Sequence, residues 1–320
     1  MSACTQGTKY VAGIRVWPFR FRLCARSPVY FPAGKAANIL RGALGSLFRK
    51  VACVPGCRAA STCDFAANCP YARAFEPKQD YYSVGGPSGL RDLPRPFAFR
   101  AYQLDGVRFD SGKMFCFDVV LFESPERLLP YLVLAFRELA WSGLGPARGS
   151  AELISVEDLE SGKLIYQNSV FNNASYSGFF CELTSTTDGT ETTFRVEFLT
   201  PTELKASGQV AGCPEFSTVF SRLRDRISNL CVFYQRGSLD VNFRELGKAA
   251  AQVVLQSGSI RHIDVERQSS RTGQLHSIGG FVGTVEYRGD LGLFLPFLRA
   301  GEWVGVGRQT VWGKGVFRLQ

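Results

Sequence analysis

The sequence predicts an α+β protein built from two tandem ferredoxin-like domains. Elements in the first half follow the order strand, helix, strand, strand, helix, strand, which is the order of a split βαβ unit. The second half repeats this order less regularly. The chain has 320 residues, 45% hydrophobic and 20% charged, which is the composition of a packed globular protein long enough for two domains.

The first predicted strand spans residues 10–26, where apolar and polar residues alternate. Phe19, Phe21 and Leu23 share one face, whereas Arg20 and Arg22 lie on the other. A period of two predicts a strand with one apolar and one basic face. The basic face is either simply solvated or binds a polyanion.

A helical pattern follows the breaker Pro32-Ala33-Gly34, with Arg41 and two glycines, Gly42 and Gly45, opposite the apolar stripe. Each glycine inside a helix costs about 1 kcal/mol relative to alanine. We therefore expect a polyanion backbone or a packed strand to approach this side closely. The stripe itself consists of Ile39, Leu40, Ala43, Leu44, Leu47, Phe48 and Val51.

The remaining elements complete both predicted domains. In the first half they are strands at Phe97–Leu104, Lys113–Glu123 and Gly149–Asp158 and a helix at Pro125–Trp141. In the second half they are strands near Phe179–Thr186, Thr192–Phe198, Ser259–Arg267 and Gly280–Arg288, and helices from Pro214 to Tyr234, at Arg244–Leu255 and at Leu291–Ala300. We expect domains at 1–165 and 166–320, with an insertion at 53–77.

The insertion contains four cysteines, Cys53, Cys57, Cys63 and Cys69. Four thiolates within a short loop can close the tetrahedral site that Zn²⁺ prefers, and such a closed site stabilises a fold rather than catalysing a reaction. The spacings are looser than those of zinc ribbons, so a redox pair and unligated thiols remain alternatives. A structural Zn²⁺ is the candidate cofactor.

The net charge is +9 and the pI is near 9.1, which favours a polyanionic partner. All ten Lys and Arg residues between Met1 and Cys63 precede the first acid, Asp64. No secretory signal or membrane span is visible, since the first apolar run is interrupted by arginines and Leu128–Phe136 is too short to span. We expect a cytoplasmic protein without a membrane partner.

The last residues form a glycine-rich loop, with glycines at 305, 307, 313 and 315. Glycines allow backbone N–H groups to approach an anion, and Arg308, Lys314 and Trp312 lie between them. The spacing excludes a P-loop and a dinucleotide fingerprint. The pattern predicts a phosphate-binding loop, and a glycine-rich hairpin without a ligand is the alternative.

Several motifs follow one another along the chain. They are Leu40-Arg41-Gly42-Ala43-Leu44-Gly45, Cys69-Pro70-Tyr71-Ala72-Arg73-Ala74-Phe75-Glu76-Pro77, Gly143-Leu144-Gly145-Pro146-Ala147-Arg148, Phe198-Leu199-Thr200-Pro201, Glu266-Arg267-Gln268-Ser269-Ser270-Arg271, Gly279-Gly280-Phe281-Val282-Gly283, Tyr287-Arg288-Gly289-Asp290-Leu291 and the glycine loop. Together they resemble the CRISPR-associated endoribonuclease family of the RAMP superfamily, which cuts precursor CRISPR RNA within its repeats. The resemblance covers nearly the whole chain.

The resemblance implies two RRM-like domains, a CRISPR repeat RNA or crRNA partner, and a role in antiviral defence beside effector-complex subunits. It also implies cleavage without a metal, in which a ribose 2′-OH attacks the adjacent phosphate and leaves a 2′,3′-cyclic phosphate and a 5′-OH. The residues that we expect to bind RNA are Arg20, Arg22, Lys35, Arg41, Arg267, Arg271, Gly305, Gly307, Arg308, Gly313, Lys314 and Gly315.

This reaction needs a base at the 2′-OH, and histidine suits that role. Family members often carry a histidine where this chain has Gly305, so the usual base is missing. Of the two histidines, His262 fits a paired or surface residue of a strand, and His276 lies in a loop that the resemblance places near the crevice. We predict His276 as the catalytic base, with Lys35 or Tyr30 as alternatives.

The leading hypothesis is a repeat-specific RNA endonuclease whose activity could be slow. The second is a weakly active or inactive RNA-binding module of an effector complex. The third, an oxidoreductase or metal sensor built on the cysteines, has the least support.

Overall fold

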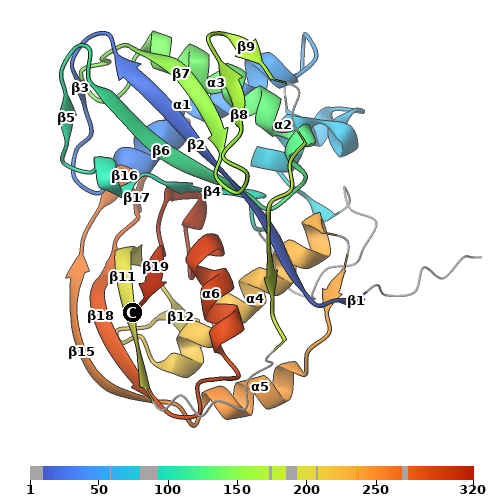
Figure 1. Ribbon diagram of the computed structural model, residues 1–320, viewed down its shortest axis with the longest axis vertical. Helices are drawn as coiled ribbons and strands as arrows, with labels where there is room; N and C mark the ends of the chain where they lie inside the picture. The colour runs from blue at the N-terminus through green and yellow to red at the C-terminus, as the bar shows by residue number, and fades with distance from the viewer. Residues whose placement is uncertain are drawn as a thin grey trace, which may run out of the picture.

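A computed structural model of the chain describes residues 10–57, 59–79, 93–172, 175–184, 193–206, 208–235, 237–268 and 273–320. Two α+β halves lie one above the other in Figure 1. Each half contains an antiparallel sheet with helices packed on it, which confirms the predicted fold of tandem ferredoxin-like domains.

The N-terminal half contains a sheet in the order β4-β6-β2-β7-β8-β9, in which all neighbours are antiparallel. Two helices, α1 (Ala36–Ala52) and α3 (Leu129–Ser142), cover one face of this sheet. A third, short helix is α2 (Pro70–Phe75). The strands are β2 (Gly13–Ala25), β4 (Phe97–Arg100), β6 (Met114–Leu121), β7 (Ala151–Asp158), β8 (Leu164–Gln167) and β9 (Val170–Phe171).

The alternation along β2 is the one that the sequence predicts. Phe19, Phe21 and Leu23 are buried beneath α1, in one hydrophobic core with Leu40 and Leu44 of that helix. The arginines between them therefore point to the opposite face of the sheet.

The C-terminal half contains a second antiparallel sheet in the order β15-β18-β11-β19. Its strands are β11 (Thr193–Thr202), β15 (Val254–Ile263), β18 (Gly280–Arg288) and β19 (Phe317–Leu319). The helices α4 (Phe216–Tyr234) and α6 (Leu295–Val304) pack against it, and α5 (Phe243–Ala250) lies at the bottom of Figure 1.

Several predicted boundaries are wrong. The strand predicted near Ser259–Arg267 is β15, which spans Val254–Ile263. The helix predicted at Arg244–Leu255 is α5, which ends at Ala250, because β15 already begins at Val254. The last helix begins at Leu295 rather than Leu291, since Pro296 occupies its first turn. The strand predicted at Phe97–Leu104 ends at Arg100, where a 3₁₀ turn follows.

Short strands complete the fold. They are β1 (Tyr10–Val11) paired with β14 (Ser238–Leu239), β3 (Val29–Tyr30) with β5 (Arg108–Phe109), β12 (Lys205–Ala206) with β13 (Gln209–Val210), and β16 (Glu266–Gln268) with β17 (Leu275–Ser277). β10 (Phe179–Glu182) pairs with β2.

The strand β2 connects the two halves and crosses from one into the other in Figure 1. Ile14 and Val16 at its start belong to the core of the C-terminal half, whereas Phe19 and the residues after it belong to the other core. The predicted division between residues 165 and 166 stays a prediction, and β8 runs across it. Within the described residues, no helix is both long and apolar enough to cross a membrane.

Candidate functional site

The glycine-rich loop uses its backbone for internal packing. Val306 N donates to Gly315 O at 2.9 Å, and Arg308 N donates to Glu203 O at 3.0 Å. A Cβ at Gly315 would lie 1.9 Å from Val306 O, and one at Gly307 would lie 2.4 Å from Glu203 O. These glycines are therefore required for close backbone contacts, and their contact with a phosphate stays a prediction.

The other two glycines of the loop also have structural roles. Gly305 ends α6, where its N–H donates to Gly301 O at 2.8 Å and its φ is +73°. Gly313 has φ +70°, and a Cβ there would lie 2.5 Å from the Cβ of Ala37 in α1. The loop therefore docks on the N-terminal half of the molecule.

Both cations of the loop have protein partners. Arg308 forms an ion pair with the carboxylate of Glu203. Lys314 is buried, and its Nζ donates to Gly34 O at 2.9 Å. Burial lowers the pKa of Lys314, and the charge of nearby Asp105 opposes this shift. Lys314 thus holds the start of α1, whereas the side chain of Arg308 stays half exposed beside Glu203.

Trp312 lies at the end of this docked segment, in a 3₁₀ turn spanning Thr310–Trp312. The guanidinium carbons of Arg41 and Arg267 lie 4.9 and 4.2 Å from the centroid of its ring. We call Arg41, Arg267 and Trp312 the arginine–tryptophan cluster. It joins α1, β16 and the C-terminal loop, three segments far apart in the sequence.

Arg41 is a cation without an anionic partner among the described residues. Its guanidinium carbon lies 4.4 Å from the ring centroid of Phe75, and its Nε is enclosed without a hydrogen-bond acceptor. Burial first, and repulsion by Arg95 and Arg267 second, lower the pKa of Arg41 to about 9. Arg267 likewise forms no ion pair within the part of the chain that the structure describes, and burial lowers its pKa.

Desolvated cations beside one another are unfavourable unless an anion joins them. Aromatic rings supply only part of the missing stabilisation, roughly 0.5–2 kcal/mol for each contact. The cluster is therefore suited to a bound anion, and guanidinium groups match phosphate oxygens well.

The hairpin β16–β17 brings His276 to the cluster. In its register, His276 lies directly opposite Arg267. Side chains of directly opposed residues share one face of an antiparallel pair, with Cβ atoms about 4.5–5.5 Å apart. His276 is exposed, so it can meet a substrate that contacts Arg267.

The other predicted residues near the hairpin have different positions. Lys35 is the N-cap of α1, and the preceding Gly34 packs against Val265, since a Cβ at Gly34 would lie only 3.2 Å from Val265 Cγ2. His262 lies in β15, with its Nε2 3.4 Å from Gly212 O. Arg271 lies outside the described residues.

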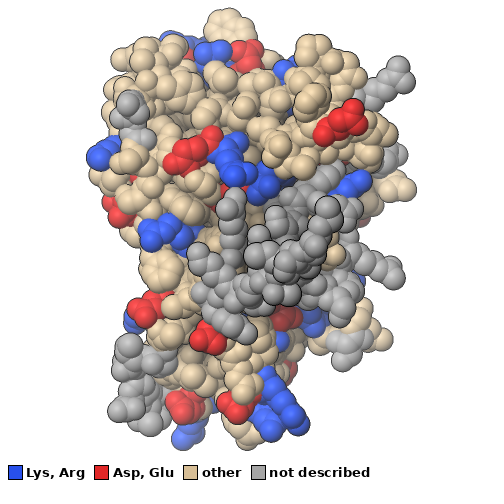
Figure 2. Space-filling model, turned by 90° about the vertical axis from the view of Figure 1, so that its right-hand side faces the viewer, with Lys and Arg blue, Asp and Glu red and all other residues tan. Residues whose placement is uncertain are grey.

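Arg20 and Arg22 do not reach the cluster. Arg20 forms a bidentate pair with Asp118, at 2.8 and 3.0 Å, and Arg22 donates to Glu157 at 2.8 Å. These carboxylates come from the neighbouring strands β6 and β7. The predicted basic face is thus a face of cross-strand ion pairs, directed away from α1. Lys and Arg also alternate with Asp and Glu over the face shown in Figure 2.

Three of the four insertion cysteines lie together. Cys53 ends α1, Cys69 precedes α2, and the thiols of Cys57 and Cys69 are both within hydrogen-bonding range of Cys53. Burial, followed by these two neighbours, raises the pKa of Cys53 to about 12. Cys63 packs with Cys69 on a small alanine cluster. Among the described residues, no group of three or more His, Cys, Asp or Glu side chains is arranged around a common metal position.

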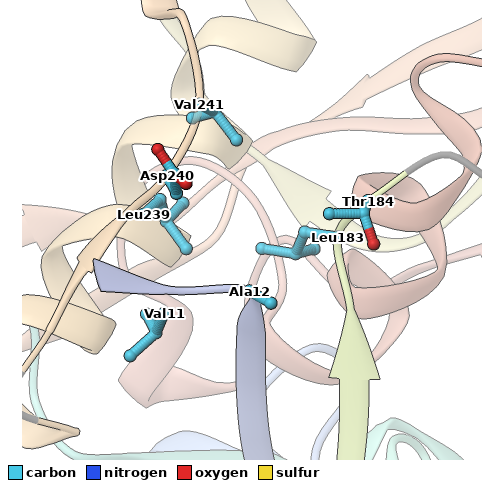
Figure 3. Close-up of a pocket in the computed structure, with 7 residues that line it drawn as sticks. All are labelled: Val11, Ala12, Leu183, Thr184, Leu239, Asp240 and Val241. Atoms are coloured by element: carbon cyan, nitrogen blue, oxygen red, sulfur yellow. The ribbon is translucent and has the colours of Figure 1, made fainter.

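A separate small pocket lies between β1, β14 and the end of β10 (Figure 3). Its volume is about 240 Å³, and aliphatic side chains such as Val11, Leu183 and Leu239 line it. Asp240 is its one charged residue, so the pocket repels phosphate.

Sequence reasoning missed Phe75 and Gln309. Phe75 supports Arg41 from α2, and Gln309 donates from its Nε2 to Ser277 O at 2.8 Å. Phe75 lies within the Cys69–Pro77 motif, which gave it no role of its own, and no sequence signal marks Gln309.

The fold and the cluster define the class: a tandem ferredoxin-like protein with a cationic site between its halves. A family model described as CRISPR-associated endoribonuclease Cas6 matches residues 196–317, and the model AF_1859_N, described as an N-terminal domain, matches residues 14–177. Residues 196–317 therefore belong to the Cas6 family of CRISPR-associated endoribonucleases, and residues 14–177 to the AF_1859_N family. No curated protein matches the sequence.

Solved structures share this fold. Thermus thermophilus Cas6 superposes with a TM-score of 0.54 at 14% identity, covering 97% of this chain and 100% of that one. A Cas6 product complex gives 0.54 at 15% identity, with 95% and 100% covered. A partial Cas6-RT-Cas1–Cas2 complex gives 0.55 at 12% identity, with 97% of this chain and 47% of the other covered.

Proposed function

We propose that this chain cleaves precursor CRISPR RNA within its repeats, without a catalytic metal ion. Membership of the Cas6-type endoribonuclease family supports RNA cleavage, and structural relatives include a product complex and a substrate mimic complex. The observation that carries the proposal is the pair of arginines on Trp312, which lack carboxylate partners among the described residues.

In the proposed mechanism, the scissile phosphate lies at the arginine–tryptophan cluster. Arg267 and Arg41 stabilise the negative charge that grows on the phosphate oxygens as the phosphorane forms. His276, across the hairpin from Arg267, accepts the proton of the ribose 2′-OH. The 2′-oxygen bonds to phosphorus, the bond to the 5′-oxygen breaks, and the departing 5′-oxygen takes a proton from water. The products carry a 2′,3′-cyclic phosphate and a 5′-OH.

We expect cleavage of repeat RNA to proceed in excess EDTA, because no step in this mechanism uses a metal ion. A substrate with a 2′-deoxyribose at the cleaved nucleotide should bind but not react, since it lacks the nucleophile. Gel analysis with end-group mapping identifies the products. Tight binding without any product would instead favour an RNA-binding module of an effector complex.

We further propose that the cysteines of the insertion hold one structural Zn²⁺, although the described residues bring only Cys53, Cys57 and Cys69 into contact. The thiols would have to lose their protons on binding. α2, which starts next to Cys69, is also tied to the N-terminal sheet by the buried ion pair of Arg73 and Glu123.

We expect about one equivalent of zinc in the purified protein, measured by elemental analysis. Cys57→Ser should reduce the zinc content and the melting temperature, because the ion would link the end of α1 to the start of α2. Cys213→Ser, at an exposed cysteine outside the insertion, is the matched control and should change neither. Zinc-free protein with an unchanged melting temperature in chelator would contradict this proposal.

A further inference from the structure

Gln309 contacts both parts of the candidate site. Its side-chain Nε2 donates to the carbonyl of Ser277, the residue after His276, at 2.8 Å. Its backbone carbonyl accepts a hydrogen bond from Trp312 N, also at 2.8 Å. One residue therefore connects the hairpin of Arg267 and His276 with the turn that presents Trp312.

The backbone of Gln309 is unusual. Its φ is +64° and its ψ +24°, in the left-handed region that non-glycine residues seldom occupy. Such conformations cost of order 1–3 kcal/mol and persist where surrounding contacts fix them. A glycine here would avoid the strain, but it would have no amide to reach Ser277.

The hairpin is anchored at its base, where the buried residues Val265 and Ile278 are joined by a hydrogen bond from Ile278 N to Val265 O at 2.7 Å. β16 and β17 form a two-stranded sheet, and the exposed residues Leu275, His276 and Ser277 make up β17. Among the described residues, one hydrogen bond connects the glycine loop to these two strands, and Gln309 donates it. The stacking of Arg267 on Trp312 is the second contact between the same two segments.

We propose that Gln309 is a positioning residue, which fixes the distance between His276 and the arginine–tryptophan cluster. This inference rests on the proposed function, since it assigns a catalytic purpose to the hairpin. Gln309 itself touches no reacting atom in this scheme. Its amide keeps the hairpin in register with the phosphate, so that the 2′-OH and His276 meet in a reactive geometry.

Gln309→Glu is the sharpest variant, because it keeps the length of the side chain and replaces the donor with an oxygen that repels Ser277 O. We expect the single-turnover cleavage rate to fall roughly 10- to 100-fold, as misplacement by about 1 Å does. The Kd for non-cleavable 2′-deoxy repeat RNA should change less than about 3-fold. Gln309→Gly should show the same loss of rate without a lower melting temperature, because it removes both the bond and the strain.

Gln252→Glu, at an exposed glutamine after α5, controls for the added negative charge and should cleave normally. Hydrogen exchange of residues 266–277 in the free protein gives a readout independent of cleavage. Gln309→Glu should accelerate this exchange whether or not the wild-type protein cleaves RNA. An inactive wild-type protein would refute the proposed function but not the contact between Gln309 and the hairpin. Unchanged exchange, a wild-type rate in Gln309→Gly, or equal losses of rate and affinity would each overturn the positioning role.

Discussion

Replacing Arg41 with methionine is expected to weaken binding of repeat RNA by roughly 10- to 100-fold without lowering the melting temperature of the free protein. A hydrogen bond to a charged group contributes about 1.5–3 kcal/mol, and each 1.4 kcal/mol is tenfold in Kd. In the free protein, Arg41 has no ion-pair partner among the described residues. Methionine fills a similar volume between Phe75 and Trp312 without a buried charge.

The lowered pKa of Arg41 shows whether its positive charge stabilises or destabilises the folded protein. Its ordinary pKa lies far above neutral pH, and burial lowers it to about 9 in the folded protein. The unfolded chain therefore binds this proton more tightly, and the charged side chain destabilises the fold at every pH below about 9. Stability is regained only as pH rises from that value towards the ordinary one, so at neutral pH methionine removes an unfavourable charge.

Filter binding across a series of salt concentrations, together with thermal denaturation, checks the prediction. The slope of log Kd against log salt concentration should decrease by about 1, the value expected for the loss of one phosphate contact. Arg195→Met is the matched control, because Arg195 lies on the C-terminal sheet in an exposed ion pair with Glu286. A much lower melting temperature in Arg41→Met, with normal RNA affinity, would show that Arg41 serves packing alone.

The sequence allowed prediction of the features that local patterns determine. The period of two in β2 and the apolar stripe of α1 placed Phe21 and Leu44 in one core, as the structure has them. The partners of polar residues could not be predicted in this way. Asp118 and Glu157 reach Arg20 and Arg22 from strands 98 and 135 residues later, so the basic face looked unpaired in the sequence.

The contacts of the glycine loop could not be predicted from its local pattern either. Its spacing indicated close backbone approach correctly, but the approaching groups are carbonyls of Glu203 and Val306 rather than a phosphate. The missing family histidine also has a physical reason. Gly305 has φ +73°, and a Cβ there would lie 3.2 Å from Gly315 O, so histidine would be strained at this position. The proposed reaction therefore takes its base from another segment, the hairpin that carries His276.

Replacing His276 with alanine is expected to slow cleavage by about 10²- to 10⁴-fold, the contribution typical of a general base, while the Kd for 2′-deoxy repeat RNA stays within about 3-fold. The side chain is exposed in β17, so its removal leaves no cavity in either core. The loss should therefore lie in the chemical step, and single-turnover kinetics with saturating protein measures that step directly.

The chain offers its own control, because it has only two histidines. His262→Ala should cleave normally, since His262 lies in β15 and contacts the Gly212 carbonyl rather than the cluster. A full rate in His276→Ala would exclude histidine at this position and direct the search to Lys35 and Tyr30. Lys35→Met and Tyr30→Phe would then show which of these residues is the base. Replacing the base should abolish cleavage while RNA still binds to the arginine–tryptophan cluster.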